Sequence, residues 1–278
     1  DSIYKETIKL IDSSDKSYAY TMLNLCVAER DLGNYEKAIY YGTLGINSSP
    51  DLEPGIESSG YDQLSYAYSL KGSYDKAISC AKIAINIKKE NYDKDYWRHG
   101  ESYYPLGYAL YKKGSYAEAV PIFEKTISYF KEMEHAQSIK NLILSTYIIL
   151  ARISLKTNDL NEYERLFDII SSYDIDRSSD LYADVLSLKS SFEILQTDPR
   201  EDSIKLWVTS SNKLYKSVFL SGSANKKFIS NNIILIDYYL KNKKYKVAKE
   251  ICLNVLMEID SYSYLDTPQF INAKVSTL

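Results

Sequence analysis

The sequence is poor in the residues that interrupt regular structure. It contains only 10 glycines and 6 prolines among 278 residues, which disfavours an architecture of many short strands joined by tight turns. Histidine is rarer still. His99 falls in a predicted loop and His135 in a polar stretch, so both are expected to be solvated, and neither has a carboxylate or a cysteine at catalytic or metal-ligand spacing. We therefore expect no enzymatic activity, no metal and no other cofactor.

Cysteine usage and charge exclude further classes of protein. Cys26, Cys80 and Cys252 are odd in number and far apart, which fits buried thiols and neither a disulfide framework nor a zinc site. The formal charge of −3 provides no basic field for nucleic acid, and the lysine cluster within 241–249 is interpreted as a solvated face. No run of 18 apolar residues occurs, so no membrane span is expected in this segment.

The stretch from Gly60 to Ile85 shows a pattern that the rest of the chain repeats. Large residues recur three and four apart in its first half, on one face of a helix: Tyr61, Leu64 and Tyr68. Small residues form a stripe in its second half: Ala77, Ala81 and Ala84. The small stripe lets two helix axes approach closely while the large side chains fill the space between them. One such helical hairpin cannot bury its own apolar face, so the pattern predicts stacked neighbours.

The turns between paired helices recur at a regular interval. Gly33, Gly72, Gly114 and Asn158 follow one another at spacings of 39, 42 and 44 residues, which indicates an α-solenoid with two helices per unit. We predict an all-α fold, a right-handed α-α superhelix that forms a single solenoid over 1–278. About six helical hairpins are expected, at 17–47, 58–89, 101–133, 138–172, 181–216 and 228–260, with unpaired or truncated helices at 1–12 and 268–278.

Polar and proline-containing segments predict where these hairpins begin. Residues 47–57 and 90–100 are expected to be connecting loops. Pro105 is tolerable only in the first turn of a helix, whereas Pro121 lies deeper and predicts a kink. Side-chain caps of second helices are expected at Asn34, Ser115 and Asp159.

These residues resemble the tetratricopeptide repeat family, whose pattern is an aromatic residue, then Leu-Gly, then Tyr, then Ala and Phe on the second helix. The third hairpin matches it at Tyr103, Leu106, Gly107, Ala119 and Phe123. The second hairpin matches it at Tyr61, Leu64, Tyr68 and Ala77. The resemblance implies a domain that binds a protein or peptide ligand.

The composition is similar to that of a narrower group. The chain has 28 tyrosines and is rich in lysine, as are the sensory segments of tetratricopeptide-containing regulators in Bacteroidetes. This resemblance implies the ligand-sensing or assembly segment of a larger bacterial regulatory protein, with a periplasmic or other extracytoplasmic location favoured over a cytoplasmic one.

The family's architecture also implies where a ligand binds. The first helices of such a superhelix line its concave face, and the residues one, five and eight positions after each leading aromatic share that face. The candidate ligand-binding residues are therefore Arg30, Asp62, Tyr66, Tyr104, Tyr108, Tyr111 and Arg152. We expect a groove with a wall of tyrosines, flanked by the two arginines, that suits an extended or helical peptide. The alternative is that the tyrosines are ordinary surface residues or pack against the next repeat.

Other functional interpretations remain open at this stage. The chain is alternatively a cytoplasmic regulator that binds a signalling oligopeptide, an assembly scaffold without a signalling role, or a repeat domain with an undetected hydrolase. The sequence does not indicate the oligomeric state or the identity of the ligand.

Overall fold

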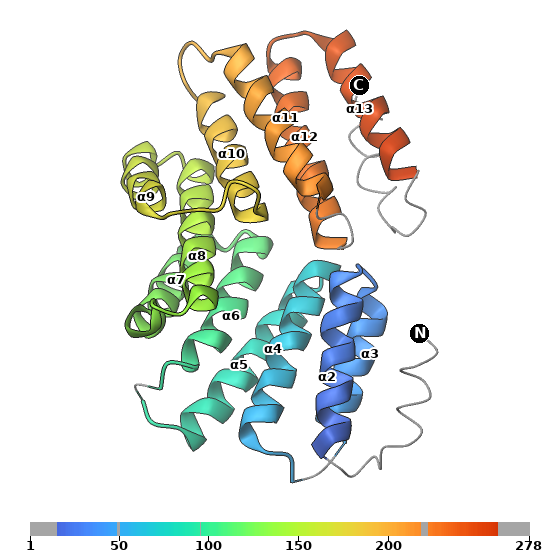
Figure 1. Ribbon diagram of the computed structural model, residues 1–278, viewed down its shortest axis with the longest axis vertical. Coiled ribbons are helices and arrows are strands. Elements are labelled where there is room, and N and C mark those ends of the chain that lie inside the picture. The colour runs from blue at the N-terminus through green and yellow to red at the C-terminus, as the bar shows by residue number, and fades with distance from the viewer. Residues whose placement is uncertain (1–15, 49–50, 95, 218–221, 261–278) are drawn as a thin grey trace. The chain divides into compact units, whose positions relative to one another are not determined.

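The computed structural model describes residues 16–48, 51–94, 96–217 and 222–260, and the regular structure of these residues is entirely helical (Figure 1). The α-helices follow one another as α2 (Lys16–Asp31), α3 (Tyr35–Ile46), α4 (Pro54–Lys71), α5 (Tyr74–Asn91), α6 (His99–Lys113), α7 (Tyr116–Phe130), α8 (Gln137–Lys156), α9 (Leu160–Ser172), α10 (Asp180–Glu193), α11 (Glu201–Ser217), α12 (Gly222–Lys241) and α13 (Tyr245–Asp260). A short 3-10 helix, η1 (Lys131–Met133), follows α7. The predicted all-α class, with successive helical hairpins, is confirmed.

The chain divides into two compact units, residues 1–153 and 154–278. In the first unit the hairpins α2–α3, α4–α5 and α6–α7 are each held by direct contacts between their two helices. In the second unit the same is true of α10–α11 and α12–α13. The predicted single solenoid over the whole chain stays a prediction. The helices predicted at 1–12 and 268–278 lie outside the described residues.

The turns within the hairpins explain the regular spacing seen in the sequence. Gly33, Gly72 and Gly114 have φ angles of +86°, +93° and +88°, a left-handed conformation that ends a helix and that glycine adopts without a steric penalty. Asn158 and Lys243 occupy the equivalent turns with φ angles of +59° and +58°. The left-handed residue is thus the common element of these hairpins, and the sequence signals it clearly only where it is glycine.

Close helix packing depends on the small residues that the sequence pattern predicted. Ala77, Ala81 and Ala84 on α5 are fully buried. On α6, a Cβ atom added at Gly107 would lie only 2.8 Å from the ring of Phe123 on α7. Helices α6 and α7 therefore approach each other at a point where any larger side chain would push the ring aside.

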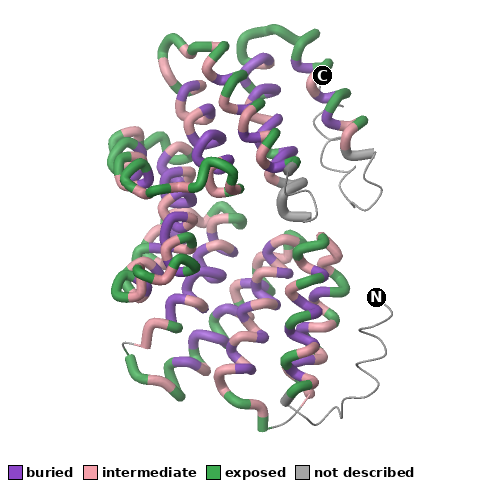
Figure 2. The backbone as a smooth tube through the Cα atoms, viewed as in Figure 1, coloured by how far each residue is buried: buried purple, intermediate pink, exposed green. Residues whose placement is uncertain are grey.

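The first helices of successive hairpins form one layer in the first unit. Helix α4 contacts both α2 and α6 directly, in addition to its hairpin partner α5, and the three helices lie side by side (Figure 1). Buried residues follow the stripes where helices meet (Figure 2). Side chains from α2, α4 and α6 that point away from the second helices therefore share one face.

The second unit has a core of its own. Its main cluster joins α11, α12 and α13 through Ile204, Val208, Tyr239, Ala248 and Cys252. Each of these residues is at most 3% exposed. The cluster fixes the spacing of the three helices, which matters for the cavity that lies between them.

Several local expectations were wrong. Helix α4 begins at Pro54, inside the predicted loop 47–57, because proline is well suited to the first turn of a helix. Pro105 lies inside α6 beyond its first turn, because α6 starts earlier than expected. Pro121 lies inside α7, as expected from its deeper position, and the distortion predicted there stays a prediction. His99 is 2% exposed, and its Nε2 lies 2.8 Å from the carbonyl oxygen of Asp93, whereas His135 is exposed as expected.

The predicted helix caps had mixed outcomes. Asp159 caps α9 by accepting a hydrogen bond from the backbone N–H of Glu162 at 3.1 Å. Asn34 precedes α3 but makes no side-chain cap; its amide donates to Glu29 at 2.7 Å instead. Ser115 likewise makes no side-chain cap of α7.

Helix α8 bears on the prediction that no segment of this chain spans a membrane. By length and composition alone its 20 residues are apolar enough to cross a bilayer, with 56% of the apolar window buried inside the protein. The buried core helix of a water-soluble domain passes the same test. The helix is therefore weak evidence for a span.

Candidate ligand-binding face of the first unit

The structure brings most of the predicted ligand-binding residues together across three helices. Tyr66 of α4 lies next to two tyrosines of α6, with ring centroids 6.0 Å from Tyr104 and 6.1 Å from Tyr108. Tyr108 in turn lies 6.4 Å from Tyr111. We call these four residues the tyrosine row. At one end of the row, the guanidinium of Arg30 on α2 lies 5.5 Å from the ring centroid of Tyr66, within range of a cation–π interaction.

The members of the tyrosine row differ in exposure. Tyr66, Tyr108 and Tyr111 are half-buried, so each offers part of a ring to a ligand. Tyr104 is only 9% exposed and meets the ring of Phe123 edge-on at 6.0 Å. Tyr104 therefore supports the row from the core, and its replacement by alanine is expected to lower stability as well as to alter the row.

The environment keeps Tyr66 neutral. Burial, followed by the neighbouring Tyr104, raises the pKa of Tyr66 well above its ordinary value, although Arg30 acts in the opposite direction. A neutral phenol donates one hydrogen bond and presents an apolar ring. The row thus combines hydrogen-bonding tips with a surface on which peptide side chains can pack.

Cationic groups flank the row at both ends. Arg30 donates to the side-chain oxygen of Gln63 at 2.5 Å and to Asp31 at 2.9 Å, which fixes its guanidinium beside Tyr66. At the α6 end, the ammonium of Lys112 lies 6.0 Å from the ring centroid of Tyr108. Desolvation, followed by the positive charge of Arg152 on α8, lowers the pKa of Lys112. Lys112 therefore stands at this end of the row, and Arg152 lies within electrostatic reach of Lys112.

Asp62 occupies a different layer from the row. Its Oδ2 lies 3.1 Å from the ammonium of Lys88 on α5 and accepts a hydrogen bond from Ser102 on α6 at 2.8 Å. The residue is 5% exposed, and burial raises its pKa to about 6, with Lys88 and Ser102 opposing the rise. Asp62 links α4, α5 and α6 beneath the face one turn before Tyr66, a position that suits support of the row better than direct contact with a ligand.

Sequence reasoning did not find Lys88, Ser102 or Lys112. Lys88 and Ser102 lie 26 and 40 residues from their partner Asp62, so no local spacing links them. Lys112 adjoins Tyr111 in the sequence, and its place at the end of the predicted stripe was the available signal. Among the residues that the structure describes, no group of histidine, cysteine or acidic side chains is arranged to hold a metal ion.

Comparison with known proteins gives a family match over part of the chain. The model of the tetratricopeptide repeat family matches residues 58–91 and 100–132, which cover most of α4–α5 and α6–α7 and include all four residues of the tyrosine row. No curated protein matches the sequence. None of the comparisons supports the narrower resemblance to Bacteroidetes regulators.

Solved structures with a similar fold are distant in sequence. Aspartyl phosphate phosphatase F from Bacillus subtilis superposes with a TM-score of 0.65 at 15% identity, over 87% of this chain and 60% of that one. A Rap protein complexed with competence and sporulation factor gives a TM-score of 0.68 at 13% identity, over 93% and 67% of the two chains. The apo form of RapI gives a TM-score of 0.65 at 12% identity, over 90% of this chain and 85% of that one.

These likenesses establish the fold and nothing finer. The chain spans 60% of the length of the phosphatase. Residues 58–91 and 100–132 match the tetratricopeptide repeat model, and the chain is similar in fold to Rap proteins.

Proposed function

We propose that this chain is a non-enzymatic repeat domain that binds a peptide or protein segment on the tyrosine row of its first unit. One observation carries the proposal: Tyr66, Tyr104, Tyr108 and Tyr111 form a continuous series of neighbouring rings across α4 and α6. Such rings supply large contact area at a low entropic cost, because a tyrosine has few rotatable bonds to immobilise.

The charges beside the row favour a ligand with acidic groups at its ends. Arg30 is already held against Tyr66, and the ammonium of Lys112, which interacts electrostatically with Arg152, lies beside Tyr108. A carboxylate that contacts both Lys112 and Arg152 would relieve their repulsion and form charge-assisted hydrogen bonds. Apolar side chains of the same ligand would pack on the exposed parts of the rings.

Selection from a displayed library of random peptides tests this proposal. Peptides selected on the intact chain are expected to bind the Tyr108→Ala and Tyr111→Ala variants at least tenfold more weakly, because each variant removes a ring from the contact surface. Both residues are half-buried, so thermal unfolding checks that the variants stay folded. Tyr40→Ala is the matched control, since Tyr40 lies on the second helix α3 and is 60% exposed. Peptides that bind all variants equally well would contradict the proposed face.

A second candidate function is regulation by a signalling oligopeptide. It is favoured by the fold similarity to a Rap protein whose structure was solved with competence and sporulation factor. The sensory segment of a larger regulator, an extracytoplasmic location and a scaffold role stay predictions.

Hydrolysis of an acyl phosphate such as acetyl phosphate is the direct test of the non-enzymatic assignment, given that one similar structure is named a phosphatase. No turnover above the spontaneous rate is expected.

A further inference from the structure

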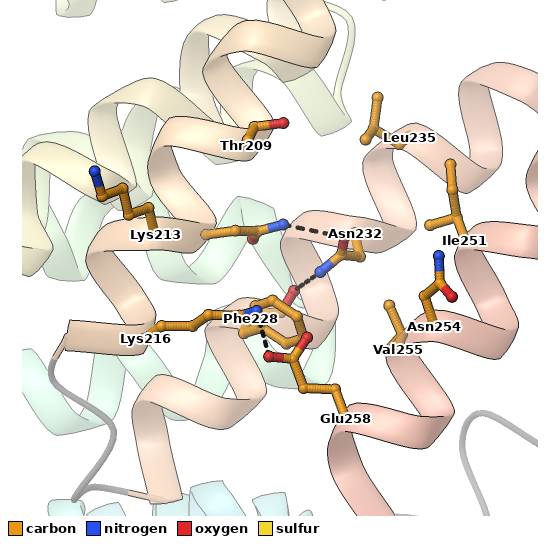
Figure 3. Close-up of a pocket in the computed structure, with 11 residues that line it drawn as sticks. Thr209, Lys213, Lys216, Phe228, Asn232, Leu235, Ile251, Asn254, Val255 and Glu258 are labelled. Atoms are coloured by element: carbon orange, nitrogen blue, oxygen red, sulfur yellow. Dashed lines mark hydrogen bonds and ion pairs between the residues drawn. The ribbon is translucent and has the colours of Figure 1, made fainter.

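The second unit contains a cavity that is separate from the tyrosine row. It measures about 410 Å³ and lies between α11, α12 and α13 (Figure 3). Phe228, Leu235 and Val255 form apolar walls and are each at most 8% exposed. This volume falls in the range of small-molecule sites, which combine an apolar lining with a few placed polar groups.

The polar groups on one wall are fixed by a chain of amides. Asn231 donates from Nδ2 to the Oδ1 of Asn212 at 2.7 Å, and Asn212 donates to the Oδ1 of Asn232 at 3.0 Å. Asn232 completes the chain by donating to the backbone carbonyl of Phe228 at 2.9 Å. Because each of these amides is already oriented, the second N–H of Asn212 and of Asn232 remains available in a defined position.

The opposite wall and one end of the cavity carry further polar groups. Asn254 of α13 extends toward the cavity (Figure 3) and has no hydrogen-bond partner in the described part of the chain. At the end of the cavity, the ammonium of Lys216 pairs with the carboxylate of Glu258 and lies 5.2 Å from the ring centroid of Phe228. These two contacts hold the ammonium at the edge of the apolar walls. An ammonium has three N–H donors, so the pair leaves donors over for a ligand.

We propose that this cavity binds a small molecule that joins one carboxylate to an apolar body. The apolar body would lie against Phe228, Leu235 and Val255, and the carboxylate would accept hydrogen bonds from Lys216 and from the Asn254 amide. The charged side chains of the lining are Lys213, Lys216 and Glu258, so its formal charge is positive and favours an anion over a cation. This proposal is independent of the proposed peptide-binding face, because the two sites share no residue.

Calorimetric titration of the full chain with three eight-carbon probes tests the recognition. Octanoate supplies the carboxylate, octanol a neutral head group and octylammonium a positive charge. Octanoate is expected to bind at least tenfold more tightly than either of the others, because only the carboxylate adds a negative charge to the hydrogen bonds that it accepts from the Lys216 ammonium. Equal binding of octanol would overturn the carboxylate assignment, and no binding of octanoate would overturn the site.

Four variants, one of them a control, locate the binding within the cavity. Asn254→Trp places a large ring into the cavity from an exposed position and is expected to abolish octanoate binding. Leu253→Trp is the control: it changes the neighbouring exposed residue and is expected to leave octanoate binding unchanged. Glu258→Gln frees the Lys216 ammonium and is expected to tighten octanoate binding several-fold, whereas Lys216→Met is expected to weaken it at least tenfold. Unchanged binding to Asn254→Trp, or weaker binding to Glu258→Gln, would contradict the proposed geometry.

Discussion

Replacement of Lys88 by methionine tests how the first unit is held together beneath the tyrosine row. Lys88 and Asp62 have side chains that are 5% and 7% exposed and lie 3.1 Å apart. Methionine keeps most of the aliphatic volume and removes the charge. Removal of one member of a buried ion pair leaves the other without compensation, and we expect a loss of about 3 kcal/mol in the free energy of unfolding near neutral pH.

The pH dependence of this loss follows from the pKa of Asp62. Burial raises that pKa from 3.8 to about 6 in the folded protein. The folded state therefore holds the proton more tightly than the unfolded state. The stability that this preference contributes is fully present below about pH 3.8 and is lost as the pH rises through about 6. Without Lys88, whose charge opposes the rise, the folded pKa moves higher still.

The pKa of Asp62 sets how much the destabilisation by Lys88→Met changes with pH. Between about pH 7 and about pH 5 the Lys88→Met variant gains about 1.4 kcal/mol for each pH unit, about 2.7 kcal/mol in total, because its Asp62 is protonated throughout that range. The parent protein gains only about 1.4 kcal/mol, because its Asp62 takes up a proton only below about pH 6. The destabilisation caused by Lys88→Met is therefore expected to shrink by about 1.4 kcal/mol on acidification.

Urea unfolding followed by tryptophan fluorescence measures the effect in the first unit alone. The chain has 2 tryptophans, Trp97 in the first unit and Trp207 in the second, so a Trp207→Phe background leaves one local reporter. Lys89→Met is the matched control, because Lys89 is the exposed neighbour on the same helix. A Lys88→Met variant as stable as Lys89→Met would refute the reasoning, as would a destabilisation that grows in acid.

Three further predictions concern single side chains. Gly107→Ala is expected to lower the free energy of unfolding of the first unit by about 1–3 kcal/mol in urea titrations, because the new Cβ would lie 2.8 Å from a packed ring. Burial raises the pKa of the Cys26 and Cys80 thiols to about 11; mass-spectrometric mapping of iodoacetamide adducts is expected to show slow labelling of both, with the less buried Cys80 reacting first. Hydrogen bonds from Lys205 and Lys244 lower the pKa of Glu201 to about 2. The stability that the ionised Glu201 carboxylate contributes is therefore present above about pH 4.5 and lost on acidification toward pH 2. Glu201→Gln is therefore expected to flatten the acid dependence of the urea midpoint of the second unit.

The sequence predicted the hairpins because the signals that define them are local. A left-handed residue between two apolar stripes needs only a few neighbouring positions to be recognised, as at Gly72 and Gly114. Helix starts were harder to place, since Pro54 and His99 begin helices inside segments that are polar in composition. Burial there is decided by contacts with other helices, which a single segment does not encode.

The candidate face was predictable as a stripe but not as a set of contacts. Repeat spacing placed Tyr66 and Tyr108 on one face, and the structure brings their rings to 6.1 Å. The same spacing gave no means to separate Asp62, which is buried in an ion pair, from the half-buried tyrosines around it. The distinction depends on Lys88, a partner on another helix. Periodicity therefore predicts which side of a helix a residue occupies, and the charges available on neighbouring helices decide how deeply it is buried.

Tyrosine content illustrates how one residue type serves two roles within the same stripe. Tyr104 packs edge-on against Phe123 and is nearly buried, whereas Tyr108, one turn later on α6, is half-buried beside Lys112. A composition with 28 tyrosines predicts neither role at a given position. The close approach of α6 to α7 at Gly107 accounts for the difference, because the ring of Phe123 reaches α6 there and also lies against Tyr104. A ligand that packs on the tyrosine row would consequently contact Tyr66 and Tyr108 directly. Tyr104 would strengthen binding only indirectly, because its packing holds the rings of Tyr66 and Tyr108 in place.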